Sequence, residues 1–461
     1  MHYETVIIGA GMSGLAAGIR LAYFGKRVCI VERHSAFGGL NSFYRLGGRE
    51  FDVGLHAVTN FVGPEVRSAP LPRLLRQLRL SRDAFQLRPQ RFSEIRFPGC
   101  RLRFSNDIGL LIGEVADRFP DQADGFRRLV AEIREYDDLQ PDVTYRSARE
   151  VLGTYLSDPL LIEMLLCPLM YYGSAQEGDM DYTALATLFK AILCEGLARP
   201  RGGVRTLIRV LVKKYRECGG ELRMKCGVQR LEVDGGGVSA LVLSDGETIT
   251  ADAVLSSAGF TETMRLCSDA EAVLATGEAG RLSFVESISC LDTTPADLGL
   301  GAAVLFYNDA ERFTYARPDG PVDVSSGVIC CPNNFDDHED LPEGLIRVTS
   351  LANPDYWDGL DEAAYRAAKQ ECYGRVLDRA ARFVPEFRDH VVFKDIFTPR
   401  TIRHYTGHVN GAVYGAPAKV RSGRTRLKNL FICGTDQGFV GIIGAMLSGI
   451  AMANLHVLQG E

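Results

Sequence analysis

Near its start the chain reads TVIIGAGMSG at residues 5–14, a β-branched run followed by three glycines in the spacing G-x-G-x-x-G. The run 5–8 predicts a strand buried on both faces, and residues 15–24 have the apolar pattern of a helix. A second apolar run, 28–31, ends in Glu32. Strand, glycine turn, helix, strand and terminal carboxylate together predict a dinucleotide-binding fold.

The glycines and the first helical turn have separate tasks in such a fold. Gly9 permits a tight turn, Gly11 lets the backbone approach a pyrophosphate, and Gly14 lets the helix pack against the strand. The N–H groups of the first turn, including those of Met12 and Ser13, bind phosphate together with the helix dipole. Glu32 is placed to accept hydrogen bonds from ribose hydroxyls. This motif alone does not separate NAD from FAD, and without its flanking strands it would fit an ordinary glycine turn.

The segment after Glu32 reads RHSAFGGLNS at residues 33–42. It resembles the extended flavin motif of the glutathione-reductase-like flavoproteins, which include amine oxidases and carotenoid desaturases. In that family the glycine pair lets the chain pass close to the pyrophosphate and the isoalloxazine, and an NAD domain has no need of it. The resemblance implies bound FAD, contacted in this segment by Arg33, Gly38, Gly39, Leu40 and Asn41.

Two further segments resemble the same family. Residues 429–436 read NLFICGTD, a strand and glycine turn that lead into a last helix. A middle segment, 200–259, resembles the part in which a residue such as Val228 holds the adenine through its backbone and whose strands return to the sheet at Gly259. In the family the late segment lies beside the flavin, which implies contacts from Gly434, Asp436, Gly441, Ile442, Ile443 and Ala445.

The resemblance covers almost the whole chain and implies its architecture. We expect an α/β fold with a Rossmann-like FAD-binding domain and an interleaved substrate domain made of a mixed sheet and a helical cap. At 461 residues the chain is too long for one compact core. We assign residues 1–66, 200–262 and 425–461 to the FAD-binding domain, and 67–199 and 263–424 to the substrate-binding domain.

Two motifs indicate a branch of the family. The stretch GREFDVGLH at residues 48–56 resembles the segment that follows the flavin motif in phytoene-desaturase-like proteins. A histidine at the end of this stretch, here His56, resembles the pattern of retinol saturases and carotenoid isomerases in particular. TPRTIRHYTG at residues 398–407 resembles the late motif of that branch. The resemblance implies an FAD-dependent oxidoreductase that desaturates, saturates or isomerises a hydrophobic polyene or isoprenoid. Residues 119–197 have a mainly helical pattern; most fit plain core packing, and together they would give an apolar lining suited to such a substrate.

The expected chemistry needs a cofactor because C–H bonds of a polyene are too weakly acidic for a side-chain base at neutral pH. Hydride transfer to or from flavin N5 removes that obstacle, while the protein orients the substrate and excludes water. His56 and His404 resemble positions near the flavin ring, so both are candidate catalytic residues. Each also fits a hydrogen-bonded structural histidine.

Two other functional classes stay open. A flavin amine or amino-acid oxidase is the nearest competitor, although its substrate amine usually lies against an aromatic cage and the only tryptophan, Trp357, is outside the motifs. The other is a prenyl-binding protein like the GDP-dissociation inhibitors (GDI), which share the fold without using a flavin. The intact glycine and carboxylate set speaks against that class. No cysteine resembles a covalent flavin-attachment motif, and Cys433 belongs to a strand, so we expect non-covalent FAD.

The composition excludes some partners. A net charge of −6 argues against nucleic acid. The twelve cysteines are scattered without a C-x-x-C pair, so we expect no metal site and a reduced, cytoplasmic protein. Residues 439–458 carry no charge and are long enough to span a bilayer, but Gly441, Gly444 and Gly449 interrupt them. We therefore predict a buried helix there.

One segment is strongly basic. Residues 67–103 hold ten arginines against two acids, and Leu71, Leu74, Leu75 and Leu78 recur at helical spacing with arginines on the opposite face. One interpretation is a solvated surface with internal ion pairs. The other is a peripheral membrane contact, with the leucines in the interface and the arginines on anionic head groups. The sequence leaves both open and leaves the oligomeric state unknown.

Overall fold

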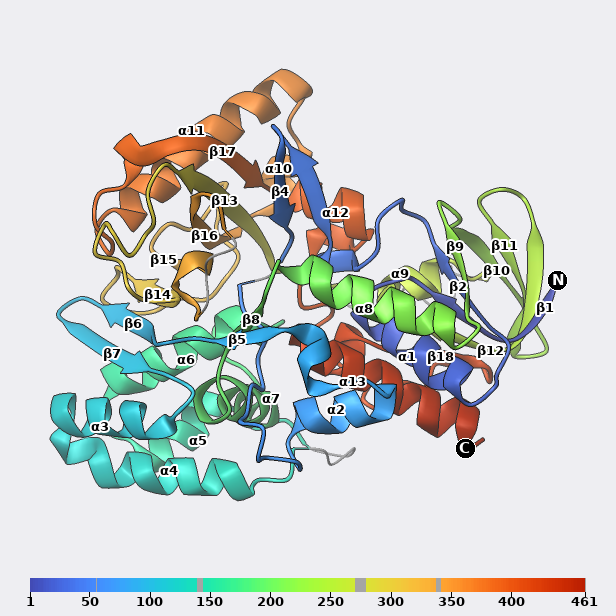
Figure 1. Cartoon of the computed structure of the whole chain (residues 1–461), viewed down its shortest axis with the longest axis horizontal. Helices are drawn as coiled ribbons and strands as arrows, with labels where there is room; N and C mark the ends of the chain where they lie inside the picture. The colour runs from blue at the N-terminus through green and yellow to red at the C-terminus, as the bar shows by residue number, and fades with distance from the viewer. Residues whose placement is uncertain (55, 139–143, 270–278, 337–340, 461) are drawn as a thin grey trace.

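The chain folds into two lobes, each built on a seven-stranded β-sheet (Figure 1). A computed structural model describes residues 1–54, 56–138, 144–269, 279–336 and 341–460. The two ends of the chain lie together in one lobe, so the intervening sequence has to leave this lobe and return to it. This is the interleaved α/β arrangement that the sequence predicted.

The first sheet has the strand order β10-β11-β12-β1-β2-β9, with β18 added beside β12. β18, β12, β1, β2 and β9 are parallel, and β10 and β11 form an antiparallel hairpin next to β12. A parallel sheet of β-branched strands with helices on its faces confirms the Rossmann-like prediction. Its strands are β1 (His2–Ile8), β2 (Val28–Glu32), β9 (Glu221–Met224), β10 (Val228–Asp234), β11 (Gly237–Leu243), β12 (Thr248–Ser256) and β18 (Leu430–Ile432).

Helices α1 (Met12–Tyr23), α8 (Val204–Glu217) and α13 (Gly441–Ala453) pack in this lobe, and α9 (Phe260–Arg265) follows β12. Two close approaches depend on glycine. A Cβ at Gly14 would lie 2.1 Å from the Gly9 carbonyl oxygen, and a Cβ at Gly449 would lie 2.0 Å from the Ser13 carbonyl oxygen. Gly14 therefore lets α1 pack on the glycine turn, and Gly449 lets α13 pack on α1.

The last helix is apolar along its whole length. Among the helices that the structure describes, Gly441–Leu458 alone is long and apolar enough to cross a membrane, with a mean hydropathy of 1.6 and half of it buried in the fold. It packs against α1 and α2 (Pro70–Leu78). This packing confirms the prediction of a glycine-interrupted buried helix.

The second sheet has the order β17-β13-β16-β15-β14-β6-β7 and is antiparallel except between β14 and β6. Helices α10 (Pro354–Asp358) and α11 (Glu362–Ala380) pack near one face. All nine residues of β13 are buried, so both faces of this strand are covered. The strands are β6 (Ser93–Phe97), β7 (Cys100–Phe104), β13 (Ser283–Leu291), β14 (Val304–Asn308), β15 (Ser326–Cys330), β16 (Gly344–Ala352) and β17 (Val391–Phe397).

A helical cap covers part of the second sheet, as the sequence predicted. Most of its apolar side chains form a single core with β6, β7, β14 and β15, and only a few reach an open cavity. Plain core packing thus accounts for most of its leucines. The helices are α3 (Ile108–Arg118), α4 (Ala123–Glu135), α5 (Ala148–Tyr155), α6 (Pro159–Gly173) and α7 (Tyr182–Phe189), which a π-helical turn continues over Lys190–Cys194.

Two segments pack differently from the predicted domain boundaries. α2 lies in the part assigned to the substrate domain, yet it packs against α1 and α13 of the first lobe. The hairpin β3 (Phe43–Leu46) and β4 (Arg49–Asp52) lies in the part assigned to the FAD-binding domain, yet Phe51 stacks on Phe393 of the second sheet. No change in composition marks either of these boundaries in the sequence.

The basic segment 67–103 corrects one expectation. Leu71, Leu74, Leu75 and Leu78 are buried in the core of the first lobe, so they cannot enter a membrane interface. Several arginines have protein partners: Arg91 pairs with Asp336, Arg96 and Arg101 with Glu94, and Arg103 with Glu114. Arg73, Arg76 and Arg79 remain exposed on the outer face of α2 and beyond its end.

Candidate active site

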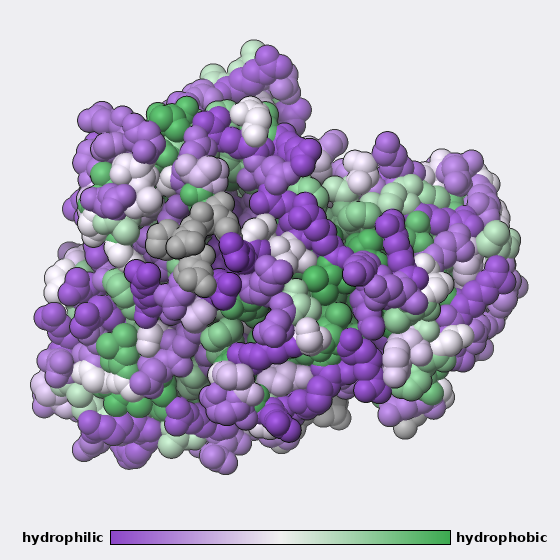
Figure 2. Space-filling model, viewed as in Figure 1, coloured by the Kyte–Doolittle hydropathy of each residue, from purple (hydrophilic) through white to green (hydrophobic). Residues whose placement is uncertain are grey.

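A cavity of about 800 Å³ lies between the two lobes and is lined by both. On the face shown in Figure 2, hydrophobic side chains reach the surface in the furrow between the lobes, over α8. Most predicted cofactor-binding residues meet in this cavity. They are Gly9, Gly11, Met12, Ser13, Glu32, Arg33, Gly38, Gly39, Leu40, Asn41, Val228, Gly434, Gly441, Ile442 and Ala445.

The cavity can hold an anionic dinucleotide because two helices point uncapped N-termini into it. Neither α1 nor α13 has a side-chain cap or an acidic residue in its first turn. A Cβ at Gly11 would meet nothing within 4 Å, so the backbone there is open to the cavity. Free N–H groups at a helix start, with the helix dipole, attract phosphate. Gly11, Met12 and Ser13 would hold the pyrophosphate of FAD.

Glu32 ends β2 at the edge of the cavity, 9% exposed. One carboxylate oxygen accepts the backbone N–H of Ala10 and the other that of His34, each at 2.8 Å. These hydrogen bonds fix the carboxylate beside the glycine turn. Its free lone pairs are placed to accept hydrogen bonds from ribose hydroxyls.

Asp436 is not among the residues that line the cavity, although the resemblance implied a contact with FAD. Its carboxylate is buried and accepts the backbone N–H groups of Phe260 at 2.6 Å and Ala416 at 2.7 Å. It therefore ties together three loops around the cavity. Gly14, Gly259 and Ile443 also lie outside the lining: Gly14 packs on the glycine turn, Gly259 lies beside Asp436, and Ile443 is fully buried.

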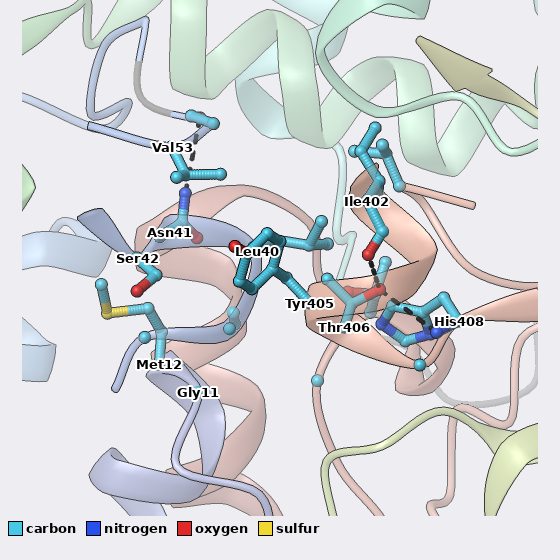
Figure 3. Close-up of a pocket in the computed structure, with 18 of the residues that line it drawn as sticks. Gly11, Met12, Leu40, Asn41, Ser42, Val53, Ile402, Tyr405, Thr406 and His408 are labelled. Atoms are coloured by element: carbon cyan, nitrogen blue, oxygen red, sulfur yellow. Dashed lines mark hydrogen bonds between the residues drawn. The ribbon is translucent and has the colours of Figure 1, made fainter. Parts of the chain in front are cut away.

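Helix α12 (Pro399–Thr406) covers the glycine-pair loop at η1 (Gly39–Asn41). Figure 3 shows Leu40 of η1 beside Tyr405 of α12, with Ile402 and Thr406 facing the cavity. The Arg33 guanidinium donates to the His404 carbonyl oxygen at 3.0 Å, which anchors the end of α12. The His404 side chain is exposed and belongs to a separate surface hollow with Arg403, so it does not line the cavity.

The wall on the second lobe is mainly apolar and aromatic. It includes Tyr172 of α6, Leu188 of α7, Phe284 of β13, Val328 of β15 and Tyr414. The Tyr414 hydroxyl donates to the Tyr171 carbonyl oxygen, and burial raises the pKa of Tyr414. These phenol groups are therefore neutral, and the wall offers a largely apolar surface.

Polar side chains interrupt that wall around His56, where Glu286 and Thr349 also line the cavity. His56 lines the cavity, and its Nε2 lies 2.8 Å from Oγ1 of Thr349 and 3.7 Å from Oε1 of Glu286. Glu286 also forms a buried ion pair with Arg347. Burial alone would raise the pKa of Glu286, but the Arg347 and His56 side chains outweigh it and lower the pKa to about 2. His56 thus faces a carboxylate that is ionised at neutral pH.

A second ion pair supports the loop that carries His56. Arg199 pairs with Asp52 at 2.6 Å and donates to the His56 carbonyl oxygen at 3.3 Å. Asp52 also accepts the backbone N–H of Val204, which fixes the start of α8. Asp52 and His56 therefore meet Arg199 and Val204 here, although the two pairs are far apart in the sequence.

Sequence reasoning missed several cavity residues. Glu286 lies in a strand that no motif marks; its signal is a lone acid in an otherwise uncharged apolar strand, opposite a strand with the lone base Arg347. Glu262 was missed as well. Burial alone would raise the pKa of this carboxyl, but hydrogen bonds from the His408 ring and the Val409 N–H lower it.

All twelve cysteines are free, and the described residues contain no cluster of histidines, cysteines and acids that could hold a metal ion. The uncapped helix starts, the fixed Glu32 carboxylate and the two-lobed cavity define an FAD-dependent oxidoreductase. Residues 12–455 match the family described as flavin containing amine oxidoreductase, and the chain belongs to that family. This membership confirms the FAD prediction and speaks against the prenyl-binding alternative without a flavin.

Curated relatives support the predicted branch. The chain is 24% identical to prolycopene isomerase 1, chloroplastic, of an Oncidium hybrid cultivar, over 98% of this chain and 83% of that protein. It is 22% identical to all-trans-retinol 13,14-reductase of Danio rerio, over 98% and 87%. These matches place the chain in the carotenoid desaturase, isomerase and retinol saturase branch.

Solved structures share the fold. An oxidoreductase from Methanosarcina mazei superposes with a TM-score of 0.70 at 17% identity, covering 98% of this chain and 99% of that one. Wild-type putrescine oxidase with bound putrescine superposes with a TM-score of 0.63 at 17% identity, covering 98% of each chain. At these identities the likeness establishes the fold alone.

Proposed function

We propose that the protein desaturates, saturates or isomerises a hydrophobic polyene or isoprenoid. The observation that carries this proposal is the apolar aromatic wall of the cavity opposite the uncapped helix starts. Relatives over nearly the full chain are named for prolycopene and retinol, both conjugated polyenes. A cavity with a large apolar lining suits this class of substrate.

Bound FAD supplies hydride transfer, which the side chains of this protein cannot perform. The protein's own part is to hold the pyrophosphate with the α1 start, to orient the polyene along Tyr172, Phe284 and Tyr414, and to exclude water. His56 is a titratable side chain in the cavity wall, and we assign it the exchange of a proton with the substrate. His404, on the outer surface, has no part in this assignment.

The alternative function is a flavin amine oxidase, because the family and the putrescine oxidase structure belong to that chemistry. Tyr172 and Tyr414 could flank an amine. Glu286 of the same cavity is already paired with Arg347, so this carboxylate is not free to bind an ammonium group. The polyene therefore fits the wall better.

We also propose a cytoplasmic location with peripheral contact to an anionic membrane. The buried leucines of α2 take no part. Arg73, Arg76 and Arg79 are exposed, and Arg79 and Arg20 stack over the exposed rings of Tyr23 and Phe24, at 4.9 and 4.5 Å. Arginines with aromatic rings at a surface suit anionic head groups and the membrane interface.

Anaerobic mixing of the FAD-loaded protein with panels of polyenes and amines separates the two functions. We expect the polyene to change its number or geometry of double bonds, by chromatography and visible spectrum, in an FAD-dependent way. Amines should leave both the flavin absorbance and their own concentration unchanged. Flavin bleaching by an amine, with every polyene recovered intact, would establish the oxidase instead.

A further inference from the structure

Glu286 and Arg347 are each the only charged residue in a buried strand. β13 reads SFVESISCL and β16 reads GLIRVTSLA, and the two side chains are 9% and 1% exposed. A buried ion pair gives little net stability over well-packed apolar residues of the same volume, because both charges must be desolvated. Its position beside the cavity histidine points to a role in the site.

The sheet register brings the groups together. Glu286 is paired across the ladder with Thr349, so both side chains leave the same face of the sheet, toward His56. Nε2 of His56 contacts both of them, at 3.7 Å from the Glu286 carboxylate and 2.8 Å from the Thr349 hydroxyl. No residue in the described part of the chain hydrogen-bonds the other ring nitrogen, Nδ1.

Charged and titratable groups approach the His56 segment from several elements. Besides Glu286 and Arg347 they are Asp52 of β4, Arg199 of β8 (Ala198–Pro200), Tyr172 of α6 and Cys330 of β15. Asp52 and Arg199 neutralise each other, and burial raises the pKa values of the Tyr172 hydroxyl and the Cys330 thiol. Glu286 is therefore the ionised group that faces the ring of His56.

We propose that Glu286 is a positioning residue that, held by Arg347, orients the His56 ring and keeps a proton on Nε2, which leaves Nδ1 to exchange a proton with the substrate. Arg347 keeps the carboxylate ionised and in place. A carboxylate beside one ring nitrogen fixes the tautomer and raises the basicity of the other nitrogen. The lowered pKa of Glu286 agrees with this arrangement.

The proton step rests on the proposed function. Desaturation removes a hydride, for which bound FAD would be the acceptor, and a proton from the neighbouring carbon. The C–H bond of that neighbouring carbon breaks, and its electron pair becomes the second bond of the new double bond. The proton bonds to Nδ1, and the imidazolium that forms is stabilised by the Glu286 carboxylate. The proton passes to water afterwards, and the reverse sequence serves saturation.

The test compares Glu286→Gln with Glu343→Gln in the FAD-loaded protein. Glu343 forms an ion pair with Arg49 at 2.6 Å just before β16, and it does not line the cavity. Nitrogen NMR of histidine-labelled protein reports the tautomer of each ring, and His56→Asn identifies the His56 signals among the eight histidines. We expect wild type and Glu343→Gln to show an Nε2–H tautomer, and Glu286→Gln to show a mixture.

The kinetic arm should show kcat lowered roughly 10- to 100-fold by Glu286→Gln, with KM nearly unchanged and an altered pH profile of kcat. If Glu286→Gln does not fold, Glu286→Asp keeps the charge for Arg347 but withdraws it from Nε2, and should give intermediate ring signals. Wild-type His56 signals in either folded variant would overturn the proposal. Because the NMR arm needs no substrate, failure to turn over any polyene would overturn the proposed function and leave the positioning role decided by the ring signals.

Discussion

The Glu32 carboxylate accepts the backbone N–H of Ala10 at 2.8 Å, which ties the end of the second parallel strand to the first glycine turn. Its other oxygen accepts the N–H of His34, at the start of the loop that leads to the glycine pair. One side chain thus fixes both glycine-rich turns. A ribose would bind to a carboxylate that is already rigid, so little conformational entropy is lost on binding.

Glu32→Gln should weaken FAD binding and the fold together. The amide has one acceptor oxygen, so one of the two backbone N–H groups loses its partner. We expect a loss of about 1–3 kcal/mol in free energy of unfolding of the apoprotein, by urea denaturation. The Kd for FAD should rise about tenfold or more, by fluorescence titration. Glu217→Gln, on an exposed face of α8, is the control and should change neither quantity. Equal effects of both substitutions would refute this role of Glu32.

The Glu286–Arg347 ion pair predicts that the free energy of unfolding decreases at acid pH. The pKa of Glu286 in the fold is about 2, below its unfolded value of about 4.3, so its contribution is complete above the unfolded value and disappears as pH falls toward 2. We expect Glu286→Gln to unfold about 3–5 kcal/mol more easily at neutral pH, because Arg347 is left buried without its partner. The deficit relative to wild type should shrink as pH falls from about 4.5 to about 2. A deficit independent of pH in this window would contradict the assigned ion pair.

FAD should be held without a covalent bond. Cys433 is buried in the turn after β18, and burial raises the pKa of its thiol to about 12, which keeps it unreactive. Acid precipitation of the yellow protein should therefore leave all flavin in the supernatant, measured by absorbance and mass spectrometry. Flavin that stays with the pellet and adds its mass to a peptide would disprove this expectation.

The surface arginines predict salt-sensitive membrane binding. Replacing Arg73, Arg76 and Arg79 together with glutamine should abolish sedimentation with vesicles rich in anionic lipid, and high salt should do the same to wild type. The control replaces Arg230, Arg366 and Lys213, three exposed cations elsewhere, and should bind like wild type. If the protein still sediments with the anionic vesicles at high salt and after replacement of Arg73, Arg76 and Arg79, these arginines do not form the membrane contact.

The cofactor half of the site could be predicted because its requirements are local in sequence. A glycine turn, the helix start behind it and the carboxylate at the next strand end are encoded within 5–32, and each has one physical reason. Five residues of this stretch, and ten more from the glycine-pair, middle and late segments, line one cavity. Asp436 shows the limit: its type and position suggested a ligand contact, but backbone N–H groups from distant loops occupy both of its oxygens.

His56 was named from its motif, but the residues around it in the substrate half could not be predicted, because they meet only through sheet register. Glu286, Arg347 and Thr349 come from two strands whose pairing is set by packing across the whole second sheet. The prediction that the leucines of α2 enter a membrane interface was wrong for a related reason. Helical periodicity gives an apolar face but does not say whether that face meets lipid or, as here, the core beside α13.

The central claim, that this cavity holds FAD against the start of α1, is tested most directly at Gly11. The backbone φ of Gly11 is −74° and a Cβ there would meet no protein atom within 4 Å, so Gly11→Val should leave the apoprotein folded while placing its side chain where the pyrophosphate lies. FAD titration of the two apoproteins, followed by flavin fluorescence, is the measurement. We predict equimolar, tight binding by wild type and loss of binding by Gly11→Val with an unchanged unfolding curve. Undiminished binding by Gly11→Val, or no binding by wild type, would contradict the account.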